Sequence, residues 1–318
     1  MRNIIFTLLD FIMFPFILIF APLFLLAART GAGISLCRRF GFQPVLIHYY
    51  QPIPKYESVP DEYFVTKQNL PGFSLHEDNI PSILGNISAY AHECAWPDHA
   101  TGKGIYFSLN PSFGFSSAVL LHTIARYFGT RTVVEIGSGY STLVTLGALK
   151  KNYPDGGFRL TCIEPNPSQW LHTVAQKHSS SITLLAQKAE YIDEAVYLKL
   201  RENDILFIDS SHVSKLNSDV NHLYLHILPR LTKGVIIHIH DIYIPYEYLR
   251  VHFYGKQKIF WNEQYLLQAF LTNNKDFEII MPGYFVQTDM NNDFRKAFPQ
   301  YDPLKHRATS SFWLRKIN

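Results

Sequence analysis

Acidic and imidazole side chains directly follow two short apolar runs in the second half of the chain. Asp209 and His212 follow the first run, and His240 and Asp241 follow the second. An imidazole with an ordinary pKa of about 6.5 can take a proton from an acceptor hydroxyl at neutral pH. Two carboxylates can alternatively hold Mg²⁺, which prefers oxygen ligands. We therefore treat His212, His240 and Asp209 as candidate catalytic residues, and Asp209 and Asp241 as candidate metal ligands.

A glycine-containing turn follows an earlier apolar run. Glu135 stands two places before Gly137, and Ser138 separates this glycine from Gly139. Two glycines this close let the backbone turn sharply and approach a ligand. A dinucleotide-binding fingerprint needs glycine or alanine at a third position, and Thr142 occupies that position. The turn therefore disfavours a nicotinamide-dependent enzyme, although this alternative stays open.

Two glutamates follow the next two apolar runs. Glu164 lies twenty-nine residues after Glu135, and a carboxylate at this place can accept hydrogen bonds from both hydroxyls of a ribose. Glu190 follows the third run. Polar groups thus follow the runs in order, as a nucleoside-binding crevice requires.

Short apolar runs alternate with amphipathic stretches from about residue 106 to the C-terminus. We predict strands at 132–136, 158–163, 182–185, 205–208, 235–239, 277–280 and 311–314. We predict helices at 116–128, 143–150, 168–178, 193–200, 220–228 and 263–271. This alternation predicts an α/β fold with a doubly wound, mostly parallel seven-stranded sheet. Ligands of such sheets bind beyond the carboxyl ends of the strands, where the polar groups stand.

Three of these strand ends resemble the motifs of one family. The segment 135–139 resembles motif I of class I S-adenosylmethionine-dependent methyltransferases. The segments 162–164 and 207–209 resemble the acidic second-strand motif and the fourth-strand motif of the same family. The resemblance covers about residues 106–318 and implies a Rossmann-like methyltransferase fold.

The histidines narrow the resemblance to a bacterial subgroup. Asp209-Ser210-Ser211-His212 and His240-Asp241 are similar to the Asp-Gly-x-His and His-Asp motifs of that subgroup, which includes many predicted sugar or small-molecule O-methyltransferases. Ser210 stands where the subgroup usually has glycine, so we expect a less open loop after the fourth strand.

The resemblance implies a role for each matching residue. Gly137 and Gly139 would pass beside the methionine part of S-adenosylmethionine, and Glu135 would orient its amino group. Glu164 would hold the ribose hydroxyls, and Glu190 would lie beside the adenine. The cofactor site implied in this way consists of Glu135, Gly137, Ser138, Gly139, Glu164, Glu190 and Asp209.

The first thirty residues form an apolar segment. Residues 11–28 carry no charge, and Arg29, Arg38 and Arg39 follow. This length matches a transmembrane anchor over residues 1–30 and exceeds the apolar region of a signal peptide, which is the alternative. The arginines on the C-terminal side predict that the rest of the chain is cytoplasmic. Prolines at positions 15 and 22 predict a kinked helix or a segment that re-enters one leaflet.

Residues 31–105 are rich in proline and tyrosine and show no sustained period, so we expect an extended or accessory segment before a methyltransferase domain at 106–318.

The net charge of +3 argues against a nucleic-acid partner. Three scattered cysteines exclude a disulfide framework. A composition of 47% hydrophobic residues excludes a disordered chain.

The sequence favours a membrane-anchored O-methyltransferase that acts at the cytoplasmic face. A saccharide, a glycan precursor or another small molecule is the expected acceptor, because aromatic residues in 243–248 and 261–265 suit a ring-bearing substrate or a packed lid. A non-catalytic membrane scaffold with the same fold is the remaining alternative.

Overall fold

The computed structural model describes residues 2–55, 59–255 and 259–318 of the chain. Two compact units are present, Met1–Tyr63 and Phe64–Asn318. The boundary between them falls inside the segment 31–105, so residues 64–105 fold together with the sheet.

The first unit contains two helices, α1 (Arg2–Thr30) and α2 (Ile34–Arg39). The stretch Phe11–Thr30 of α1 is long and apolar enough to cross a membrane, and almost none of it is buried within the protein. The helix continues through Pro15 and Pro22. No re-entrant turn therefore forms in the described part of this segment, and α1 is one uninterrupted helix of 29 residues.

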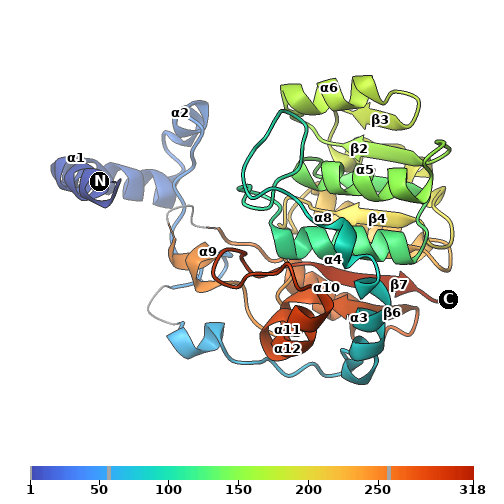
Figure 1. Ribbon diagram of the computed structural model, residues 1–318. Coiled ribbons are helices and arrows are strands. Elements are labelled where there is room, and N and C mark those ends of the chain that lie inside the picture. The colour runs from blue at the N-terminus through green and yellow to red at the C-terminus, as the bar shows by residue number, and fades with distance from the viewer. Residues whose placement is uncertain (1, 56–58, 256–258) are drawn as a thin grey trace. The chain divides into compact units, whose positions relative to one another are not determined.

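The second unit is built on a seven-stranded sheet in the order β3-β2-β1-β4-β5-β7-β6 (Figure 1). The strands are β1 (Thr132–Ile136), β2 (Arg159–Ile163), β3 (Ile182–Leu185), β4 (Ile205–Ile208), β5 (Ile236–Ile239), β6 (Phe277–Pro282) and β7 (Phe312–Lys316). Strand β7 runs antiparallel to both of its neighbours, β5 and β6, and the other pairs are parallel. The predicted mostly parallel sheet is confirmed.

Helices cover the sheet, and α4 and α5 lie side by side across one face (Figure 1). The helices of this unit are α3 (Ile80–Ser88), α4 (Phe115–Tyr127), α5 (Tyr140–Asn152), α6 (Gln169–Lys177), α7 (Ala195–Leu198), α8 (Asp219–His222), α9 (Arg250–Tyr254), α10 (Glu263–Leu271), α11 (Gly283–Asp289) and α12 (Asn291–Ala297). The helix expected over 220–228 is not a single α-helix. After α8 it widens to a π-helical turn over Leu223–Ile227, and Pro229 then lies in a short 3₁₀ turn.

The helix α3 was not expected from the sequence. Its buried residues Ile80, Leu84 and Ile87 recur at helical spacing, and Pro81 lies in its first turn, where a missing N–H is tolerated. The helix packs against α4 and α12. Helical order therefore begins well before residue 106.

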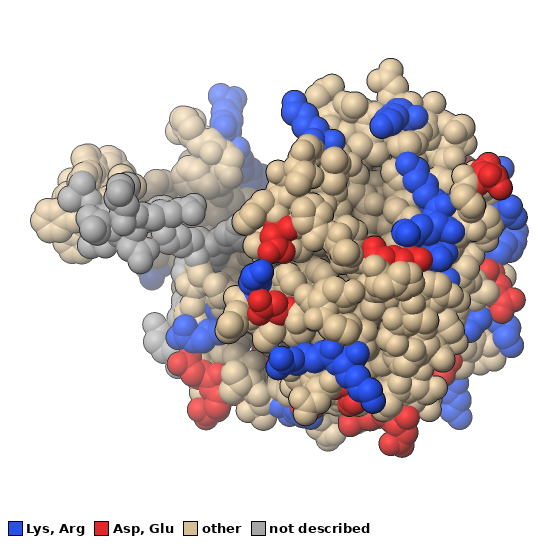
Figure 2. All heavy atoms as spheres, in the orientation of Figure 1, with Lys and Arg blue, Asp and Glu red and all other residues tan. Residues whose placement is uncertain are grey.

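Lys and Arg side chains are interspersed with Asp and Glu over the face of this unit that Figure 2 presents. The charges form no continuous band of one sign on that face.

Candidate active site

The polar residues after the parallel strands lie in one row, because the backbone ladder continues one residue past the strand ends. The N–H of Asp209 donates to the carbonyl of Ile136 at 3.0 Å, and the N–H of His240 donates to the carbonyl of Ile208 at 2.8 Å. Gly137 is held in the same way by the end of β2. The sheet thus places the residues that follow β1, β4 and β5 next to one another.

Gly137 and Asp209 are in close contact at the point where the strand order reverses, between β1 and β4. Gly137 has a φ of +78°, and a Cβ atom built on it would lie 2.0 Å from the carbonyl oxygen of Asp209. Only glycine fits this turn, since it combines a left-handed backbone with a close approach of two chains. This switch point is where α/β sheets bind ligands.

A cleft of about 280 Å³ opens beside this turn. Four of the residues predicted to bind a cofactor line it: Gly137, Glu164, Glu190 and Asp209. One oxygen of the Glu164 carboxylate accepts a hydrogen bond from the N–H of Asn166 at 2.8 Å. The other oxygen has no hydrogen bond within the described chain and remains available to a ribose.

Glu135 does not line the cleft. It is fully buried beneath the glycine turn, where Ser141 donates a hydrogen bond of 2.5 Å to one of its oxygens. Its other oxygen has no partner among the described residues. Burial raises the pKa of Glu135 to about 8, although the neighbouring hydroxyls of Ser141 and Thr142 oppose this shift.

The remaining two predicted cofactor residues belong to the turn itself. The Ser138 hydroxyl donates to the carbonyl of Glu135 at 3.3 Å, and the N–H of Gly139 donates to the hydroxyl of Thr142 at 3.1 Å. Thr142 therefore caps the first turn of α5 at the position where a dinucleotide fingerprint would have glycine.

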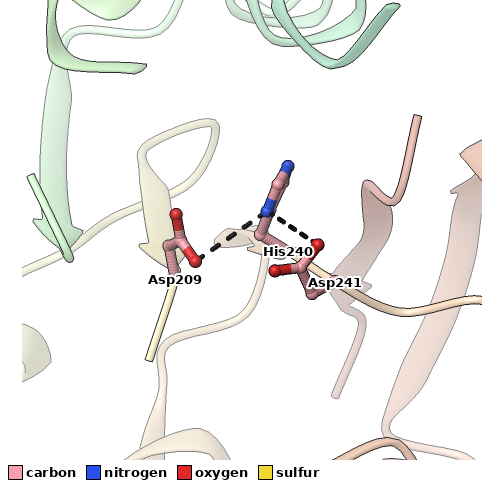
Figure 3. A group of neighbouring side chains, drawn as sticks. All are labelled: Asp209, His240 and Asp241. Atoms are coloured by element: carbon pink, nitrogen blue, oxygen red, sulfur yellow. Dashed lines mark ion pairs between the residues drawn. The ribbon is translucent and has the colours of Figure 1, made fainter. Parts of the chain in front are cut away.

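The four candidate catalytic and metal-binding residues form one cluster at the edge of the cleft. His212 Nε2 lies 3.2 Å from an oxygen of Asp209 and 3.5 Å from an oxygen of Asp241. His240 Nδ1 lies 3.4 Å from Asp241 and 3.8 Å from Asp209 (Figure 3). Both histidines are buried, with 6% of each residue exposed. Residues that are 29 and 31 positions apart in sequence therefore lie less than 4 Å from one another.

Charge holds this cluster together. Burial alone would lower the pKa of His212, but hydrogen bonds with Asp209 and Glu263 raise it well above its ordinary value. Burial would likewise raise the pKa of Asp241, but the neighbouring His240 and His212 hold it well below its ordinary range. His212 and Asp241 both adopt a left-handed backbone, with φ of +59° and +57°. Such strain is typical of functional sites.

Glu263 is a site residue that the sequence reasoning missed. This fully buried carboxylate, in the first turn of α10, accepts hydrogen bonds from His212 Nδ1 and from the Ser210 hydroxyl, both at 2.8 Å. The indole of Trp261 lies against the imidazole, with ring centroids 4.5 Å apart. From the sequence alone, an acidic residue in the first turn of a helix predicts only a charge that stabilises the helix N-terminus.

Two serines on other elements complete the surroundings of His240. The Ser117 and Ser310 hydroxyls lie 3.3 Å and 3.4 Å from His240 Nε2. Ser310 also donates a hydrogen bond of 2.8 Å to Asp241. No sequence pattern marks these serines, which lie in α4 and just before β7.

Three of these side chains could hold a metal ion. One ligand atom from each of Asp209, His240 and Asp241 lies within 4.8 Å of the others. His240 Nδ1 is buried and makes no hydrogen bond, and it faces both carboxylates (Figure 3). An unpartnered buried nitrogen beside two carboxylates fits a divalent cation.

Comparisons with known proteins address the same part of the chain. Residues 134–242 match a family described as a methyltransferase domain. An uncharacterized protein of Archaeoglobus fulgidus is 27% identical over 165 residues, which span 50% of this chain and 74% of that protein.

Solved structures also align with the chain. The apo structure of CmcI-N160 has 16% identity and a TM-score of 0.39, covering 87% of this chain and 90% of that one. A Burkholderia thailandensis 1,6-didemethyltoxoflavin-N1-methyltransferase, solved with S-adenosylhomocysteine, has 15% identity and a TM-score of 0.34, covering 80% and 95%. Residues 134–242 are thus similar to a methyltransferase domain, and this similarity rests on the family match and on the motifs at the strand ends.

Proposed function

We propose that the protein uses S-adenosylmethionine to methylate a hydroxyl group of a saccharide, a glycan precursor or another small molecule. The observation that carries the proposal is the cleft at the switch point of the sheet, with a free carboxylate oxygen of Glu164 at one side and the His–Asp cluster at the other. When bound, S-adenosylmethionine supplies an activated methyl group. The protein then has to orient the acceptor and remove its proton.

The cofactor-binding part of the proposal assigns each lining residue a task. Glu164 accepts hydrogen bonds from the ribose hydroxyls, and Glu190 lies beside the adenine. Gly137 and Gly139 let the backbone approach the methionine part. Glu135 has an indirect task. It accepts a hydrogen bond from Ser141, which stabilises the glycine turn, and its side chain does not line the cleft.

The His–Asp cluster is the proposed place where the acceptor loses its proton. His212 and His240 act as bases in one version of this step. In the other version Asp209 and Asp241 bind a cation that lowers the pKa of the acceptor hydroxyl, and the facing nitrogen of His240 favours this second version.

Aromatic side chains border the cluster and form the proposed acceptor wall. Trp261 packs on His212 and lies 4.9 Å from the ring of His252, which is itself 5.7 Å from Tyr243. Flat apolar faces beside polar groups suit a sugar or another ring-bearing acceptor.

The apolar stretch of α1 is the proposed membrane anchor. Arg29, Arg38 and Arg39 follow it, and this excess of positive charge supports a cytoplasmic location for the proposed methyltransferase domain. The acceptor would then be a membrane-associated or cytoplasmic molecule.

Calorimetric titration of the purified protein with S-adenosylmethionine and, separately, with NAD tests the cofactor. We expect binding of S-adenosylmethionine only, and a 10- to 150-fold loss of affinity in Glu164→Ala, which corresponds to about 1.5–3 kcal/mol for hydrogen bonds to a charged group. Glu202→Ala is the control, because Glu202 is exposed and pairs with Arg315 at the surface, away from the residues that line the cleft. Preferred binding of NAD, or unchanged affinity in folded Glu164→Ala, would contradict the proposal. Binding without turnover on any acceptor would favour the non-catalytic scaffold.

A further inference from the structure

We infer that His212 is a fourth protein ligand of a divalent cation bound by Asp209, His240 and Asp241, and that Glu263 is its positioning residue. The two imidazoles make this a centre for a first-row transition metal rather than for Mg²⁺. The inference rests on the proposed methyl transfer only for its catalytic role, since the binding of the cation is a separate property.

The tautomer of His212 is fixed by what surrounds it. The Glu263 oxygen that lies 2.8 Å from His212 Nδ1 acts as the hydrogen-bond acceptor, so this nitrogen carries a proton. A cation at the cluster would replace the second proton of the ring and meet the lone pair of Nε2, the nitrogen that lies close to both Asp209 and Asp241. Ser210 donates to the same Glu263 oxygen and holds the carboxylate in place.

The same reasoning applies to His240. Ser310 donates its proton to Asp241, so its oxygen is left to accept from His240 Nε2. The proton then resides on Nε2, and the lone pair of Nδ1 points toward the oxygens of Asp209 and Asp241. Two nitrogen lone pairs and two carboxylates that face one another repel unless protons or a cation lie between them.

Asp209, His240 and Asp241 form a group that could hold one metal ion, and His212 Nε2 lies close to one oxygen of each of its two carboxylates. Ligand atoms about 2.1 Å from a metal lie about 3.0–3.4 Å apart at neighbouring positions and about 4.2 Å apart at opposite positions. The four nitrogen-to-oxygen distances of the cluster are 3.2, 3.4, 3.5 and 3.8 Å. Mg²⁺ prefers oxygen ligands, whereas imidazole nitrogen favours ions such as Fe²⁺ and Zn²⁺.

Glu263 follows the pattern of a carboxylate that orients a metal-binding histidine. Such a partner holds the ring in one orientation and makes the opposite nitrogen more basic. The backbone supports the same arrangement, because the N–H groups of Asn262 and Glu263 both donate to the carbonyl of His212, at 3.0 Å and 3.2 Å. The start of α10 therefore holds His212 by its ring and by its backbone.

Binding of Mn²⁺ to the full-length, EDTA-treated protein tests the inference, because bound Mn²⁺ is detected by electron paramagnetic resonance without turnover. We expect one Mn²⁺ per chain, displaced by Mg²⁺ only at concentrations at least tenfold higher. Pulsed spectra are expected to show coupling to two imidazole nitrogens. One coupling disappears in His212→Ala, and the Mn²⁺ affinity falls at least tenfold.

Glu263→Gln tests the positioning role, since glutamine keeps the shape of the side chain but not its charge. We expect both nitrogen couplings to remain and the Mn²⁺ affinity to fall roughly tenfold, the lower end of the effect of such partners. Glu247→Gln is the matched control. Glu247 is also buried, but its carboxylate bonds to Tyr265 and to the Tyr248 backbone rather than to the cluster, so its Mn²⁺ affinity should match that of the wild type.

Three results would overturn the inference: no Mn²⁺ binding, equal affinity for Mg²⁺ and Mn²⁺, or unchanged nitrogen coupling and affinity in folded His212→Ala. The affinity for S-adenosylmethionine, measured on the same metal-free samples, separates the two proposals. Intact cofactor binding without Mn²⁺ binding would contradict only the metal centre. Loss of both in the wild type would also contradict the proposed function.

Discussion

Gly137 lies so close to Asp209 that a Cβ atom at position 137 would overlap with the carbonyl oxygen of Asp209. This contact joins the turn after β1 to the end of β4, and it places the floor of the proposed cofactor cleft directly beside the His–Asp cluster. The backbone of one residue thus sets the distance between the proposed site of the methyl donor and the groups proposed to act on the acceptor.

Gly137→Ala should disrupt this arrangement. Its Cβ would meet the Asp209 carbonyl at 2.0 Å, and alanine is strained at a φ of +78°. We expect a loss of stability of at least about 1–3 kcal/mol and loss of S-adenosylmethionine binding, measured by urea denaturation and calorimetry. Gly147→Ala, in the middle of α5 with nothing within 4 Å, is the control and should be neutral or stabilising. A Gly137→Ala protein with normal stability and affinity would show that the contact is unimportant.

Glu135→Gln should change how stability depends on pH. The pKa of Glu135 is about 8 in the folded protein, above the ordinary value of 4.5, so folding takes up a proton between these two values. The stability that the protonated form contributes is complete below about pH 4.5 and is lost as the pH rises to about 8. Glutamine does not titrate, so the slope between pH 5 and pH 8 should become less negative by up to about 1.4 kcal/mol per pH unit. Denaturation at four pH values measures this slope, and identical slopes in both proteins would refute the shift.

Glu93→Ala should destabilise the fold without affecting the cleft. The buried carboxylate of Glu93 binds His122 at 2.8 Å and Arg126 at 2.9 Å, so its removal leaves Arg126 without its buried partner. We expect a loss of about 3–5 kcal/mol in thermal or urea unfolding, and an unchanged affinity for S-adenosylmethionine in the folded fraction. Glu194→Ala breaks the half-exposed pair with Arg230 and should destabilise the fold far less than Glu93→Ala, because solvent screens an exposed ion pair. Equal losses in the two variants would contradict the importance of burial.

Deletion of residues 1–30 should release the protein from membranes and leave cofactor binding intact, because the proposed cofactor site lies entirely within the unit that begins at Phe64. Fractionation of cells that express the full-length and shortened proteins, followed by an alkaline wash of the membranes, measures the release. A full-length protein in the soluble fraction, or one cleaved near residue 30 and exported, would contradict the cytoplasmic anchor.

The sequence by itself predicted the sheet and the residues at its carboxyl edge. Parallel strands buried on both faces must be short apolar runs, and the run at 205–208 is fully buried as β4. Gly137, Asp209 and His240 could be found because each stands directly after such a run, and the alternation of strands and helices fixes which ends of the strands share an edge.

Tertiary structure alone decided what surrounds these residues. Glu263 reaches His212 from α10, fifty-one positions further along the chain. Ser310 reaches Asp241 from the segment before β7. Such contacts depend on how helices and the antiparallel strand pack onto the sheet, and no local pattern encodes them. Glu135 is a further example. Its place in the sequence predicted a residue that lines the cleft, but its side chain at the end of β1 is fully buried. Sequence periodicity specifies which face of an element is apolar, but the partner of a buried polar group is specified only when the elements are packed together.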